Sequence, residues 1–248
     1  MLEELASTFP ILTCMLFLPL VGAVVLWLFD DEDMVRTSAL TIALVELALS
    51  VFVLLRFIPE SAAMQFAEHV EWIPALGISY HLAVDGISVL FVGLTAFLTV
   101  LIVIYSWDTV RHQVKLYMMA LLALETTTMG VFLSIDLILF FVFWELMLIP
   151  SYFLIKLWGG GAERHYAALK YVLYTLLGSV FMLVGIALLD LNYHQWAMLR
   201  HIEPAYSFDL LALLSVPISF SQQVLIFWLL FLRASSAGKA IAMPGLAR

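Results

Sequence analysis

Three ionisable residues lie inside or beside long apolar segments: Glu145, Glu125 and Lys170. Glu145 lies about ten residues into the apolar stretch that starts near residue 135, which is about 15 Å at the helical rise. A charge at the centre of a bilayer costs roughly 2.5–3.5 kcal/mol on insertion scales. Because burial and a nearby cation shift the proton affinity of a carboxylate in opposite directions, a moving partner can switch its protonation. We therefore interpret Glu145 as a proton-relay residue. The alternative is a protonated glutamate that donates one interhelical hydrogen bond.

Glu125 and Lys170 are candidates for the same relay. Glu125 precedes three threonines, residues 126–128, whose hydroxyl groups can solvate a buried carboxyl. It lies about ten residues before the turn at residues 134–136, and Glu145 lies about ten after it, so antiparallel helices would hold both carboxyls at similar depth. A wall hydrogen bond is the alternative role for Glu125. Lys170 either extends its ammonium to the membrane interface or faces inward, where it would tune Glu145.

Other polar residues give weaker signals. Glu46 lies in the middle of an apolar segment without a partner that the sequence identifies, and contact with another helix is one interpretation. His81 and Asp85 flank the start of another segment, where a solvated interfacial histidine is the simpler interpretation. Pro150 removes a backbone hydrogen bond near residue 146 and predicts a kink close to Glu145.

The elements that position these residues are apolar segments long enough to cross a membrane. The chain is 64% hydrophobic and 12% charged, whereas soluble domains are about half apolar and a quarter charged. We predict an all-α, polytopic bundle of about seven transmembrane spans. Their approximate ranges are 10–29, 37–57, 86–105, 116–134, 135–158, 166–189 and 210–232. Alternating residues in the polar connection 58–85 suggest a short hairpin on the membrane surface.

Composition also excludes several classes of function. The net charge of −8, without a basic run, gives no sign of a nucleic-acid partner. Gly159 to Gly161 is not a phosphate loop, because no Gly-Lys-Ser/Thr follows it. With Cys14 as the single cysteine, the chain has no iron–sulfur or cysteine-based metal motif. We expect no cofactor on this chain, which would offer a path for protons rather than for electrons.

Charge in the connections predicts the orientation. The acidic start at Glu3 and Glu4 does not suit a cleaved signal peptide, so we expect the first span to be retained. The odd-numbered connections hold more basic residues than the even-numbered ones, which places them in the cytoplasm and the N-terminus outside. The residues behind this bias are Arg36, Arg111, Lys115 and Arg164, against Arg56 and Arg200.

Three segments resemble the antiporter-like membrane subunits of respiratory complex I, of the subunit M type, a family that also includes subunits of Mrp-type antiporters and membrane-bound hydrogenases. The segments are residues 79–88, with Val-Asp-Gly-Ile-Ser, residues 143–152, with Phe-Trp-Glu-Leu, and residues 167–179. The resemblance runs from about residue 10 to residue 232, and full members have about fourteen spans.

The resemblance implies roles and partners. Glu145 matches the family's fifth-span glutamate, which pairs with a seventh-span lysine, and Glu125 and Lys170 match a fourth-span glutamate and a sixth-span lysine. It implies a proton-translocating subunit in the bacterial inner membrane, surrounded by lipid and by other membrane subunits of the assembly. NADH, FMN, iron–sulfur clusters and quinone would be bound by those partner subunits. A cation/proton antiporter subunit and a hydrogenase subunit are the alternatives.

The last residues depart from the family pattern. Residues 1–232 correspond to the N-terminal half of an antiporter-like domain, whereas residues 233–248 form a small, basic tail that suggests a frameshift or truncation. Lys239 does not occupy the family motif, and we do not assign it the seventh-span role. A truncated remnant that transports nothing is therefore a third interpretation.

Overall fold

The computed structural model describes residues 5–6, 10–201 and 206–242, and the side chains of residues 10–201 and 206–231. Within this part, five helical segments are long and apolar enough to cross a membrane. They are α2 (Glu32–Arg56), α3 (Ser88–Thr109), α4 (Val114–Leu133), the pair α5 (Leu137–Leu146) and α6 (Leu148–Trp158), and α7 (Arg164–Arg200). Shorter apolar helices are α1 (Ile11–Leu26) and the first part of α9 (Phe220–Ala242). The predicted all-α polytopic bundle is confirmed.

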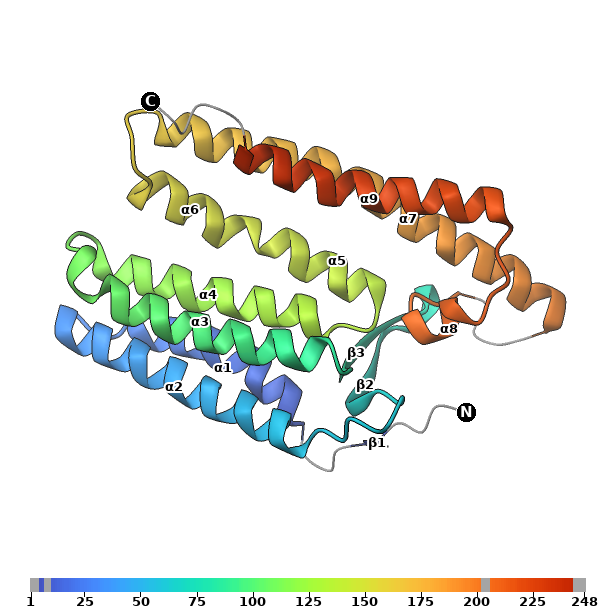
Figure 1. Cartoon of the computed structure of the whole chain (residues 1–248), viewed down its shortest axis with the longest axis horizontal. Helices are drawn as coiled ribbons and strands as arrows, with labels where there is room; N and C mark the ends of the chain where they lie inside the picture. Colours follow the sequence, from blue (N-terminus) through green and yellow to red (C-terminus); the bar gives the residue numbers. More distant parts are fainter. Residues whose placement is uncertain (1–4, 7–9, 202–205, 243–248) are drawn as a thin grey trace.

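The helices lie side by side, and α4 is the central one (Figure 1). It packs against α1, α2, α3, α5 and α6. In its most apolar window 56% of residues are buried inside the chain, against 22–33% for the other four long segments. The outer faces expose large apolar side chains, among them Val24, Leu90, Phe97 and Leu177. Such faces suit contact with lipid or with neighbouring membrane helices.

Two predicted boundaries were wrong. The segment 210–232 is interrupted: α8 (Leu210–Leu214) ends, and α9 begins at Phe220. Pro217 lies in the break and has no N–H with which to continue a helix. The predicted loop after residue 189 is largely helix, because α7 continues to Arg200. Its last turns bury Tyr193 and Ala197 against α8, which gives them a packing partner that the local sequence does not reveal.

The predicted hairpin is present. Strands β2 (Gln65–Ile73) and β3 (Ile78–Val84) pair antiparallel, and a short β1 (Leu5–Ala6) pairs parallel with β2. The turn is a 3₁₀ segment, Pro74–Leu76, followed by Gly77 at φ +65°. The hairpin lies at one end of the bundle beside α8 (Figure 1), which we call the hairpin end. The connections after α1, α3 and α6 gather at the opposite end, the loop end.

Candidate proton path

Glu145 lies at the last turn of α5, next to an interruption of the helix. The regular helix stops at Leu146 and resumes at Leu148, with Pro150 in the first turn of α6. Pro150 has no N–H to donate to the carbonyl of Leu146, so a backbone acceptor becomes available one residue from Glu145. The interruption lies where Pro150 predicts a kink. Glu145 itself is half-buried, and its helix packs against both α4 and α7.

Glu125 lies in the middle of α4 and is 2% exposed. It interacts with Thr99 of α3 and with the charge of Glu46 on α2. Glu125 therefore faces α2 and α3, the helices that precede α4. Glu145 lies on the next helix, α5. This association with α2 was not predicted.

Two contacts fix the relative depth of Glu125 and Glu145. The Thr128 hydroxyl lies 3.7 Å from the sulfur of Met147, and Gly130 packs against the ring of Phe143. Counting residues from these contacts at 1.5 Å each separates the two carboxyl-bearing backbones by roughly 5–8 Å along the bundle. The expectation of similar depth therefore holds to about one helical turn.

Lys170 lies in the second turn of α7, near the loop end. Its ammonium sits 5.6 Å from the centre of the Tyr166 ring, and the side chain is half-buried. Arg164 at the start of α7 and Trp158 at the end of α6 both lie at the loop end. Lys170 is about 9 Å along the helix from Arg164, and Glu145 is about 20 Å from Trp158. Lys170 is thus placed between the loop end and the level of Glu145.

A second polar group, at the hairpin end, was missed. Asp136 is fully buried and caps α5 by accepting from the N–H groups of Ile138 and Leu139 at 2.9 and 3.1 Å. Its other oxygen accepts from the backbone N–H and the hydroxyl of Ser79 on β3, at 2.9 and 3.2 Å. An aspartate just before an apolar run is a helix N-cap signal, so the cap was readable from the sequence. The contact with β3 was not.

His81 was expected to be solvated, and this prediction was wrong. The side chain is 3% exposed, and its Nδ1 lies 2.5 Å from a carboxylate oxygen of Asp209. Asp209 also caps α8 through the N–H groups of Leu211 and Ala212. Burial raises the pKa of Asp209, but the hydrogen bond and charge of His81 outweigh it, so the pKa lies below its ordinary value of 3.8. The pair joins residues 128 positions apart, which no local pattern could reveal.

Capping also explains the Val-Asp-Gly-Ile-Ser motif. Asp85 accepts from the N–H groups of Ile87 and Ser88, and the Ser88 hydroxyl accepts from the N–H of Asp85. This reciprocal arrangement satisfies donors at the start of α3. In the same way Glu68 of β2 accepts from the N–H groups of Leu12 and Thr13 at the start of α1.

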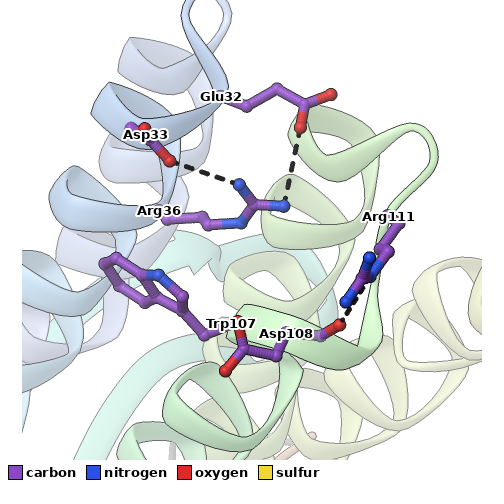
Figure 2. Close-up of a pocket in the computed structure, with 6 residues that line it drawn as sticks. All are labelled: Glu32, Asp33, Arg36, Trp107, Asp108 and Arg111. Atoms are coloured by element: carbon purple, nitrogen blue, oxygen red, sulfur yellow. Dashed lines mark hydrogen bonds and ion pairs between the residues drawn. The ribbon is translucent and has the colours of Figure 1, made fainter.

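A pocket of about 360 Å³ opens at the loop end (Figure 2). At its centre Arg36 reaches Glu32 at 3.5 Å and Asp33 at 3.4 Å, and donates to the carbonyl of Val110 at 3.1 Å. Trp107, Asp108 and Arg111 complete the lining. Arg36 ties the start of α2 to the connection between α3 and α4, which is a structural role. Among the described residues, no group of three or more His, Cys, Asp or Glu side chains could hold a metal ion.

Comparison with known proteins identifies relatives for this arrangement. A family model described as NADH:quinone oxidoreductase/Mrp antiporter, transmembrane, matches residues 134–243. NADH-quinone oxidoreductase subunit M of Rickettsia conorii is 35% identical over 230 residues, which cover 90% of this chain and 44% of the relative. Subunit M of Rhodobacter capsulatus is 44% identical over 181 residues, 71% of this chain and 35% of the relative. The chain thus spans less than half the length of these relatives.

Solved structures give the same result for the fold. A chain of respiratory complex I from Thermus thermophilus with bound NADH superposes with a TM-score of 0.74 at 26% identity, covering 90% of this chain and 43% of that one. A chain of the Mrp complex from Dietzia sp. superposes with a TM-score of 0.73 at 21% identity, covering 91% and 23%. The second likeness concerns the fold alone.

Proposed function

This chain belongs to the antiporter-like family of NADH:quinone oxidoreductase and Mrp antiporter membrane subunits, and from this we propose that it forms part of the proton route of a complex I-like enzyme. It is a membrane-embedded protein, and its bacterial relatives indicate the inner membrane. The observation that carries the proposal is the placement of two carboxyl groups inside the bundle, Glu125 on the central helix and Glu145 at a helix break.

In this proposal the protein moves protons and other subunits move electrons. Glu145 accepts a proton when its surroundings favour the neutral form and releases it when a cation approaches. Lys170 supplies a positive charge on the loop-end side, and Glu125 receives or delivers protons within about one turn of Glu145. The carbonyl of Leu146, released by Pro150, can hold a water molecule between them. NADH, FMN, iron–sulfur clusters and quinone would belong to partner subunits in the same membrane assembly.

An antiporter subunit is the second candidate, favoured by the likeness of the fold to the Mrp complex chain. It would use the same carboxyl groups, but proton movement would be driven by a cation gradient and not by electron transfer. Transport that depends on sodium and not on NADH would identify it.

The test is Glu145→Gln, which keeps the size of the side chain and removes its ionisation. In inverted membrane vesicles we expect NADH-driven proton pumping to be abolished, while NADH oxidation by an artificial electron acceptor stays unchanged. The matched control is Glu71→Gln, on the exposed part of the hairpin. Both variants should comigrate with the NADH-oxidising band on a native gel. Normal pumping by Glu145→Gln would refute the role.

A further inference from the structure

A polar layer crosses the bundle between two apolar clusters. The cluster on the hairpin side includes Leu16, Val53, Ala96 and Met129. The cluster on the loop side includes Ala23, Ala39, Val103, Leu121 and Leu122. Between them, most of the buried positions of α1 to α4 carry small or polar residues, and the apolar one is Val100. The small or polar residues are Pro19, Gly22, Ala43, Glu46, Ser50, Thr99, Glu125, Thr126 and Thr127. On each of the four helices these residues lie between the same two clusters, so the polar residues lie at a similar depth in the bundle.

Glu46 and Glu125 lie at the centre of this layer. Glu46 is fully buried and Glu125 is 2% exposed. Arg36 of α2 donates to Val110, just before α4, and so sets the level of the two helices at the loop end. Glu46 lies about 15 Å along α2 from Arg36, and Glu125 lies about 16 Å along α4 from its first residue, Val114. Helices α2 and α4 pack directly, and the two carboxyl charges interact.

The surroundings leave these carboxyl groups few other partners. Both oxygens of Glu46 are buried and have no hydrogen-bond donor within reach among the described residues, and the Thr126 hydroxyl is in the same condition. The other charged groups of α2, α3 and α4 lie towards the ends of these helices: Glu32, Asp33, Arg36, Arg56, Asp108 and Lys115. On α1 the one ionisable side chain is Cys14, which lies on the outer surface. From the next helix, α5, the nearest acid is Glu145.

Two adjacent buried carboxylates cannot both stay ionised, because like charges in a poorly solvated site repel strongly. One proton on the pair resolves the conflict: one carboxyl group is neutral while the other carries the negative charge, and the proton passes from one group to the other through a bridging water molecule. Such a pair releases its two protons in two steps that belong to the pair and not to either residue.

We propose that Glu46 and Glu125 form a carboxyl pair that shares one proton in the middle of the membrane. The pair takes up a second proton as an O–H bond on the remaining carboxylate, and returns by releasing it. The pair extends the proton route of the proposed function from the central helix α4 to α2. The extension of the proton route to α2 rests on the proposed function, whereas the existence of the carboxyl pair does not.

Infrared difference spectroscopy of the purified protein, with ¹³C-labelled glutamate, tests the pair directly. The carboxylic acid C=O band is followed during a pH titration in the wild type, in Glu46→Gln and in Glu125→Gln. We expect each variant to lose one step and to move the remaining step by more than about one pH unit, because the partner charge is gone. Glu71→Gln should leave both steps in place.

The proposal is overturned if the remaining step of either variant keeps its wild-type pH, since the two groups would then be independent. Circular dichroism, together with the amount of protein in the membrane, establishes that the variants fold. If Glu46→Gln does not fold, Glu125→Gln alone is sufficient, because the titration of its remaining carboxyl group, Glu46, can be compared with the wild type. The result is separate from the pumping assay of Glu145→Gln, so failure of the pair and failure of the proton-route function can be told apart.

Discussion

At the scale of single residues, the acidic groups fall into two kinds according to what their oxygens contact. Asp85, Asp136 and Asp209 each accept backbone N–H groups at the start of a helix. Glu46 and Glu125 lie in the middle of helices, where all backbone donors already bond to carbonyl groups. The first kind stabilises the ends of the helices by accepting these hydrogen bonds, whereas the second lies where the backbone offers no free donor.

Asp209 offers a test of the first kind. Asp209→Asn keeps a good N-cap for α8 but removes the charge that faces His81. We expect a loss of about 1–3 kcal/mol at pH 6, as for a hydrogen bond to a charged group. Because the folded pKa of Asp209 is lowered, this stabilisation is fully present above the ordinary value of 3.8 and is lost as the pH falls through the folded value.

The measurement is the thermal midpoint in detergent at pH 6 and pH 3. The difference between wild type and Asp209→Asn should be clear at pH 6 and smaller at pH 3. The control is Asp31→Asn, an exposed N-cap of α2 that should change little at either pH. An equal difference at both pH values would contradict the assignment of the effect to the carboxylate.

The local sequence predicts which acidic residues lie inside the membrane, but it does not predict which residues they contact. A glutamate inside an apolar segment is conspicuous by itself, so Glu125 and Glu145 were found without the fold. The pairing of Glu46 with Glu125, or of His81 with Asp209, depends on which helix packs against which. That arrangement is decided by side chains far apart in the chain, so single-sequence reasoning left Glu46 without a partner.

At the scale of elements, the sequence was informative where one residue type dictates the backbone. Pro150 predicted the interruption between α5 and α6, and alternating residues predicted the hairpin. Pro217 is the same kind of signal, but the apolar residues on both sides of it predict one continuous segment, and the structure has two helices there. The end of α7 could not be found locally, because its last turns are stabilised by packing against α8.

Gly77 tests how the hairpin is joined to the rest of the protein. At φ +65° it adopts a left-handed conformation, and a Cβ atom there would collide with the carbonyl oxygen of Tyr206. We expect Gly77→Ala to lower the free energy of unfolding by about 1–3 kcal/mol. The control is Gly160→Ala, where a Cβ meets nothing within 4 Å and φ is not left-handed. Equal thermal midpoints for the two variants would show that the turn is not constrained as described.

At the scale of the whole molecule, the two ends of the bundle differ in charge and in structure. Lys115 reaches Asp30 at 3.0 Å, and the Trp158 ring donates to the carbonyl of His112 at 3.0 Å, so three connections meet at the loop end. This end carries the basic residues that predicted a cytoplasmic position. The hairpin and α8 occupy the other end (Figure 1). The direction of any proton route depends on which end faces the cytoplasm.

Thiol labelling of right-side-out vesicles determines this orientation. In a Cys14→Ala background, single cysteines are introduced at Glu71 on the hairpin and at Gly160 in the connection before α7, both exposed positions. Because basic connections stay in the cytoplasm, a membrane-impermeant maleimide should label Glu71→Cys in intact vesicles and Gly160→Cys only after permeabilisation. The parent Cys14, which lies on the apolar outer face of α1, should stay unlabelled in both conditions. The reverse pattern would place the loop end outside, and Lys170 would then lie on the external side of Glu145 rather than on the cytoplasmic side.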